Sequence, residues 1–120
     1  MSRILIADDR QDSIERLARE IAAEGYDVTI ADTGGEVLED VLRQPPPDIV
    51  ILGPGLAMHD GYETCTLLRA DPDIPARMPI ILLADRDVDH RRMERAGFTA
   101  VLSRECAATD LRELLSQWIG

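Results

Sequence analysis

The chain has 120 residues, of which 45% are hydrophobic and 30% charged, and its formal net charge is −10. This length suits one globular domain that buries about two thirds of its unfolded surface, so we assign residues 1–120 to a single domain. The negative charge argues against nucleic-acid binding through a basic surface, and no apolar run approaches the roughly 20 residues of a membrane span.

Short apolar runs alternate with segments of helical periodicity along the whole chain. We predict strands at Arg3–Ala7, Val28–Ala31, Ile49–Leu52, Pro79–Ala84 and Thr99–Ser103. Helices are expected between Asp12 and Gly25, Thr33 and Leu42, Asp60 and Ala70, Val88 and Ala96, and over the segment that carries Leu111, Leu114, Leu115 and Trp118. Five β/α units in a row imply a parallel sheet with helices on both faces.

Several helix starts carry residues that are suited to capping. Three pairs have the spacing of a capping box: Asp12 with Glu15, Thr33 with Glu36, and Asp60 with Glu63. Asp85 or Asp87 is expected to cap the helix after the fourth strand. In the last helix, we expect Leu115 and Trp118 to pack in the core.

The two cysteines and two histidines are isolated. Cys65 and Cys106 lack metal-site spacing, which is typical of reduced, partly buried thiols in a cytoplasmic protein. The N-terminal residues run directly into a strand without a signal-peptide pattern, which also favours a cytoplasmic location. His59 and His90 are expected on the surface.

In sheets of this kind, ligands bind beyond the carboxyl ends of the strands. The polar or small residues at these ends are Asp8, Asp9, Gly53, Ala84, Asp85, Ser103 and Arg104. We therefore expect any functional site to lie among them.

Three stretches resemble the receiver domain of two-component response regulators, in the same order and spacing. They are Ile4–Asp9, Pro47–Leu52 followed by Asp60–Glu63, and Met78–Leu83. The resemblance covers the whole chain. It implies a flavodoxin-like, doubly wound three-layer α/β sandwich with a five-stranded parallel sheet in the order 2-1-3-4-5.

The resemblance also implies where phosphoryl chemistry would occur. In that family, an aspartate after the third strand accepts a phosphoryl group from a kinase histidine, and Mg²⁺ is held by this aspartate and an acidic pair. Counting back from Asp60 places the acceptor position on Gly53, which has no side chain. The acidic pair survives as Asp8 and Asp9.

The switch positions of the family are changed as well. The hydroxyl position falls on Ala84, the aromatic position on Val101 and the lysine position on Arg104. We therefore interpret the chain as a pseudo-receiver: a non-enzymatic protein-interaction module of bacterial signalling that works without phosphorylation. Since Asp8 and Asp9 lack a third carboxylate, we expect weak or no Mg²⁺ binding and no cofactor.

The expected partner is a signalling protein or a fused output domain. Docking is expected through the face formed by the fourth helix, fifth strand and fifth helix, which the family also uses for homodimers, or through the first helix. We expect no contact with nucleic acid or membrane through this domain.

Arg104 carries the sharpest hypothesis. Its guanidinium can pair with a carboxylate through two hydrogen bonds, so we predict that it reaches Asp8 or Asp9 and replaces both metal and phosphate with a fixed ion pair. The alternative is a solvent-exposed arginine. A different class of function also stays open, namely a switch gated by phosphorylation of Asp85 or by a small ligand near Gly53–Gly55.

Overall fold

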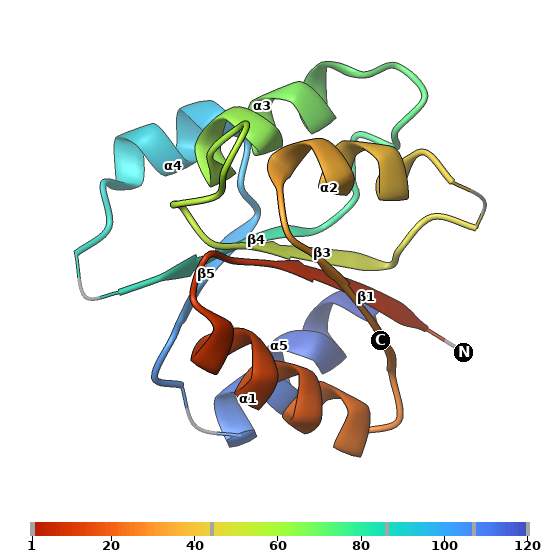
Figure 1. Cartoon of the computed structure of the whole chain (residues 1–120), viewed down its shortest axis with the longest axis vertical. Coiled ribbons are helices and arrows are strands. Elements are labelled where there is room, and N and C mark those ends of the chain that lie inside the picture. The colour runs from red at the N-terminus through yellow and green to blue at the C-terminus, as the bar shows by residue number, and fades with distance from the viewer. Residues whose placement is uncertain (1, 44, 86, 107, 120) are drawn as a thin grey trace.

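The computed structural model describes residues 2–43, 45–85, 87–106 and 108–119. Over these residues, five parallel strands form one sheet in the order β2-β1-β3-β4-β5 (Figure 1). The strands are β1 (Arg3–Ala7), β2 (Asp27–Ala31), β3 (Ile49–Leu52), β4 (Ile80–Ala84) and β5 (Ala100–Ser103). The helices are α1 (Gln11–Ala23), α2 (Gly34–Val41), α3 (Gly61–Ala70), α4 (His90–Ala96) and α5 (Ala108–Ile119). The expected flavodoxin-like fold and strand order are confirmed.

The sheet separates two hydrophobic clusters because successive strand residues point to opposite faces. In β1, Leu5 and Ala7 face the cluster beneath α2, α3 and α4, while Ile4 and Ile6 face the cluster beneath α1 and α5 (Figure 1). Because both faces are covered, β3 and β4 are apolar and buried at every position.

Two of the predicted helix caps are confirmed. The Thr33 hydroxyl accepts a hydrogen bond from the Glu36 N–H (3.1 Å), and the Asp60 carboxylate accepts one from the Glu63 N–H (2.8 Å). In α2 the Glu36 carboxylate reaches back to the backbone N–H of Asp32 at 3.0 Å, which completes a reciprocal cap around Thr33.

The other cap predictions are wrong. Helix α1 begins one residue before Asp12, and its N-cap, Arg10, makes no side-chain cap hydrogen bond. Helix α4 begins at His90 and is capped by Asp89, whose carboxylate accepts from the Arg92 N–H (3.1 Å). Asp85 lies too far before this helix to cap it and pairs with arginines instead.

The prediction for α5 holds for Leu115 but not for Trp118. Leu115 is fully buried, whereas Trp118 is 36% exposed. Helical periodicity predicts which face of α5 a side chain lies on, but not whether neighbouring elements extend far enough to cover it. In the last turn of α5 the indole ring of Trp118 is therefore only partly covered.

Both cysteines are free and buried. Burial raises the pKa of the Cys65 thiol to about 12, with Arg69 acting in the opposite direction, and burial also raises the pKa of Cys106.

In the part of the chain that the structure describes, none of the helices has both the length and the apolar character that a membrane crossing needs.

At the amino-terminal edge of the sheet, Arg3 forms a cluster of polar contacts that joins several elements. Its Nη1 donates to Asp40 (2.6 Å) and Thr29 (3.2 Å), and its Nη2 donates to the Pro45 carbonyl (3.0 Å). Its backbone N–H donates to Asp48 at 2.8 Å. Since the Arg3 and Asp40 side chains are only 22% and 13% exposed, this cluster joins β1, β2, α2 and the segment before β3 with little screening by solvent.

We expect Arg3→Met to lower the free energy of unfolding by about 1–3 kcal/mol, because it leaves the buried part of Asp40 without its charged partner. Urea denaturation measures the change. The control is Arg112→Met, which removes an exposed pair with Glu24 and should cost about 0–1 kcal/mol. Equal losses in the two variants would contradict the role assigned to Arg3.

Candidate functional site

The candidate site lies at the carboxyl edge of the sheet, where strands that are distant in sequence end together. The register pairs Ala7 with Leu52 and Ala84 with Ser103, so the residues that follow β1, β3, β4 and β5 meet at one edge. The backbone N–H of Gly53 donates to the Ala7 carbonyl at 2.7 Å, which joins the ends of β1 and β3.

A buried ion pair occupies the centre of this edge. Nη1 of Arg104 donates to Oδ2 of Asp8, and the two side chains are 5% and 0% exposed. The other carboxylate oxygen of Asp8 accepts from the Asp9 N–H at 2.9 Å. The predicted contact is confirmed, with Asp8 rather than the exposed Asp9 as the partner. Burial lowers the pKa of the Arg104 guanidinium, but an arginine remains charged throughout the working pH range.

Asp8 also fills the space above Gly53. A Cβ built on Gly53 would lie 2.6 Å from Cγ of Asp8 and would overlap its Oδ1. Gly53 has no unusual backbone angle, so it is this close approach and not its conformational freedom that excludes a side chain. The Asp8–Arg104 pair and the glycine are therefore mutually dependent.

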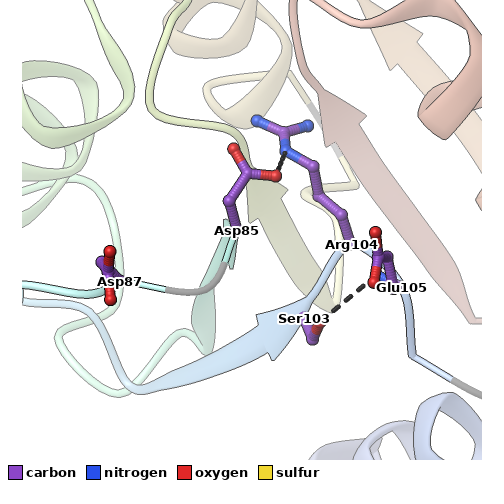
Figure 2. Close-up of a pocket in the computed structure, with 5 residues that line it drawn as sticks. All are labelled: Asp85, Asp87, Ser103, Arg104 and Glu105. Carbon is purple, nitrogen blue, oxygen red and sulfur yellow. Dashed lines mark hydrogen bonds and ion pairs between the residues drawn. The ribbon is translucent and has the colours of Figure 1, made fainter.

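The ion pair continues outward to the loop after β4. Nε of Arg104 lies 3.2 Å from Oδ1 of Asp85, and Nη2 of Arg10 lies 3.1 Å from its Oδ2 (Figure 2 shows the Arg104–Asp85 contact). The Arg104–Asp85 contact is an ion pair without hydrogen-bond geometry, and Nε has no hydrogen-bond partner within the described part of the chain. Asp85 is 55% exposed.

An open cleft of about 490 Å³ borders this ion pair. It is lined by Asp85, Asp87, Ser103, Arg104 and Glu105 (Figure 2). Among the described lining residues, three carboxylates accompany one guanidinium that Asp8 already neutralises, and this set does not favour an anion such as a phosphoryl group.

The other predicted positions, Ala84, Val101 and the two histidines, bring no polar side chain to this edge, although the Ala84 carbonyl accepts from the Arg104 N–H. Ala84 is buried and presents only a methyl group, and Val101 packs against the cluster beneath α2, α3 and α4. His59 pairs with Glu63 at 2.7 Å on the surface, and His90 is exposed at the start of α4.

The loop after β3 is held by backbone contacts. The Gly53 N–H donates to the Ala7 carbonyl of β1, and the Pro54 carbonyl accepts from the Gly61 N–H at 3.1 Å. Farther on, Ala57 pairs with Thr33, and Met58 adopts a positive φ of 72° with its side chain 80% exposed. Positive φ is uncommon for a residue with a side chain, so the loop is pinned in a specific shape.

Sequence reasoning missed two arginines that support the site, Arg10 just before α1 and Arg16 within it. Arg10 pairs with Asp85, and Arg16 donates to the carbonyl oxygens of Arg104 and Cys106, the latter at 3.0 Å. No motif marks either residue, because both partners lie far away in sequence and come close only in the folded sheet.

The residues at this edge do not fit a Mg²⁺ site. Such a site needs several oxygen ligands in near-octahedral geometry, whereas Gly53 supplies no side-chain carboxylate and Asp8 is bound by a guanidinium. In the described ranges, no three His, Cys, Asp or Glu side chains converge as a metal ligand set.

Comparisons with known proteins give one consistent result. Residues 4–116 match the family model described as the response regulator receiver domain. The chain is 38% identical over 98 residues to the response regulator MprA of Mycolicibacterium vanbaalenii and 39% identical to that of Mycobacterium leprae. Each alignment covers 82% of this chain and 40% of the relative, so the chain spans about two fifths of the length of these relatives.

Solved structures share the fold closely. The receiver domain of the sensor histidine kinase PA1611 from Pseudomonas aeruginosa, solved with a magnesium ion in its active-site cleft, is 26% identical with a TM-score of 0.88. That alignment covers 99% of this chain and 98% of the other. The chemotaxis protein CheY4 of Vibrio cholerae is 19% identical with a TM-score of 0.85, over 98% of both chains, and shows likeness of fold alone.

We expect Arg104→Met to lower the free energy of unfolding by about 3–5 kcal/mol, because it leaves the Asp8 carboxylate buried without a counter-charge. The double variant Asp8→Asn with Arg104→Met should recover much of this loss, since no buried charge remains. Urea denaturation of Arg104→Met, Asp8→Asn and the double variant measures the difference. A double variant as unstable as the sum of its single variants would contradict a direct pairing.

Proposed function

Because the chain belongs to the response regulator receiver family, we propose that it acts as an atypical receiver that binds a protein partner without phosphoryl transfer. The observation that carries the proposal is the position of Asp8. Its carboxylate lies over Gly53, at the place where an acceptor side chain would begin, and is held there by Arg104. An acyl phosphate requires a carboxylate nucleophile at that place, and glycine offers none.

The surrounding residues support the same proposal. Ala84 has no hydroxyl to donate to a phosphoryl oxygen, and the Arg104 guanidinium is already bound to Asp8. Phosphoryl transfer relies on cations that neutralise charge on the transferred group, and here the cation is already neutralised by carboxylates. On this proposal the domain is not an enzyme and has no Mg²⁺ requirement.

Two features favour docking through the face formed by α4, β5 and α5. Helix α4 carries the exposed Arg91, although the chain as a whole is strongly acidic. The exposed Arg92 and Arg95 lie on the side of α4 next to α3, where Arg92 stacks over Tyr62. Trp118 of α5 is partly exposed, and tryptophan is enriched among the residues that dominate binding at protein interfaces. The partner would be a separate signalling protein, a second copy, or an output domain of a longer protein. The exposed side of α1 is the competing surface.

We expect the protein to acquire no phosphoryl group from acetyl phosphate with Mg²⁺, while a receiver that retains its acceptor aspartate is labelled in parallel. Intact-mass spectrometry measures the product. Backbone amide NMR with Mg²⁺ and beryllofluoride, a phosphoryl mimic, should show no saturable shifts at Asp8, Asp9 or Arg104.

Stoichiometric labelling would overturn this proposal. Loss of that labelling in Asp85→Asn would then favour the alternative, a switch gated through a relocated acceptor. Saturable shifts around Gly53–Gly55 with a small ligand instead would favour ligand gating.

The homodimer form of the docking proposal can be measured with Trp118, the one tryptophan of the chain. We expect sedimentation to show concentration-dependent dimerisation, with a blue shift of tryptophan emission as the ring is buried. Trp118→Ala should weaken this association at least tenfold, roughly the effect of losing an interface hot spot. Leu42→Ala, which changes an exposed apolar residue after α2, is the matched control. A monomer at all concentrations would exclude the second copy as partner.

A further inference from the structure

Four charged side chains form a continuous chain of contacts across the carboxyl edge of the sheet. In order they are Asp8, Arg104, Asp85 and Arg10, hereafter the ion-pair chain. They come from three loops at this edge: Asp8 and Arg10 from the β1–α1 loop, Asp85 from the β4–α4 loop and Arg104 from the β5–α5 loop. The ion-pair chain therefore links loops that no single helix or strand connects.

The inner and outer halves of this chain differ in burial. The Asp8 and Arg104 side chains are almost fully enclosed, whereas Asp85 and Arg10 are 55% and 53% exposed. A buried charge cannot easily leave its partner, because it would then be desolvated without compensation. The Asp8–Arg104 pair is therefore held in one position. The ion pair between Asp85 and Arg104 attaches the exposed β4–α4 loop to it.

The segment that carries Arg104 is itself held from two sides. Its backbone N–H donates to the Ala84 carbonyl at 2.9 Å, at the end of β4. From the opposite side, Arg16 of α1 donates to the carbonyl oxygens of Arg104 and Cys106. The position of the guanidinium is therefore determined by the backbone around it and not by its side chain alone.

The loop attached to the Asp8–Arg104 pair leads directly into α4. This helix has only seven residues, and its buried or half-buried apolar contacts are Ala96, Met93 and the preceding Val88. Polar contacts add to these, since Arg92 stacks over Tyr62 and Arg69 donates to the Gly97 carbonyl just after the helix. Because the apolar contacts of α4 are few, its position depends on these polar contacts and on the loop before it.

We propose that the ion-pair chain is a permanent lock, which holds the β4–α4 loop against the β5–α5 loop and keeps α4 in one position without a phosphoryl group. This inference rests on the proposed function and deepens it, since it names what sets the conformation of the α4–β5–α5 docking face. A partner or variant that separates Asp85 from Arg104 releases α4 while the inner pair stays in place.

Native-state hydrogen exchange of backbone amides tests the lock, with α4 amides compared with α3 amides in the same protein. Asp85→Asn removes the link but leaves the buried pair intact. We expect α4 amides to exchange about threefold to fivefold faster relative to α3, the range expected for loss of a partly exposed ion pair. The matched control is Glu24→Gln, which makes the same chemical change in an exposed pair with Arg112 and should leave the ratio unchanged.

A second variant tests the inner half of the lock. Asp8→Asn combined with Arg104→Met removes both buried charges, and α4 exchange should accelerate as in Asp85→Asn. Adding Asp85→Asn to it should then cause only a small further acceleration, because Asp85 retains just its exposed pair with Arg10. An unchanged α4-to-α3 ratio in Asp85→Asn, or a full further acceleration in the triple variant, would overturn the lock.

Different experimental results would contradict the lock and the proposed function. Unchanged exchange in Asp85→Asn, with a wild-type protein that takes no phosphoryl group, overturns the lock and leaves the proposed function intact. Stoichiometric labelling of the wild-type protein overturns the proposed function, whatever the exchange experiment shows.

Discussion

The buried pair of Asp8 and Arg104 is the interaction on which the rest of the carboxyl edge depends. Two charges removed from water must stay together, because either one alone would be desolvated without compensation. This requirement fixes the β5–α5 loop above the end of β1. It also explains the glycine after β3, since the Asp8 carboxylate takes the space that a side chain at Gly53 would need.

The ion pair also changes what this edge of the sheet can do. In the receiver family the edge is where a cation and a transferred phosphoryl group meet, and both enter from solution. Here the cation is the guanidinium of Arg104, which is part of the protein and is already neutralised by Asp8 and Asp85. A tethered charge cannot dissociate, so an edge built this way favours one conformation over a switch between two, as the proposed phosphorylation-independent docking requires.

Much of the fold and part of the site could be predicted from the sequence. The five strands follow from apolar runs, and the caps at Thr33 and Asp60 follow from local spacing. The contact between Arg104 and the acidic pair could be predicted because parallel strands end at the same edge. The cap at Asp12 and the burial of Trp118 were wrong, since local spacing does not show which side chains find distant partners or how far the core extends.

The sequence by itself determined the alternation of strands and helices, the family, and the residue types at the ends of the strands. It did so because these depend on local periodicity and on composition at single positions. Only the tertiary structure decided that Asp8 and not Asp9 receives Arg104, and that Asp85, Arg10 and Arg16 join the same edge. These contacts join residues up to 96 positions apart, and they exist because the sheet order and the crossover helices bring the β1–α1, β4–α4 and β5–α5 loops together.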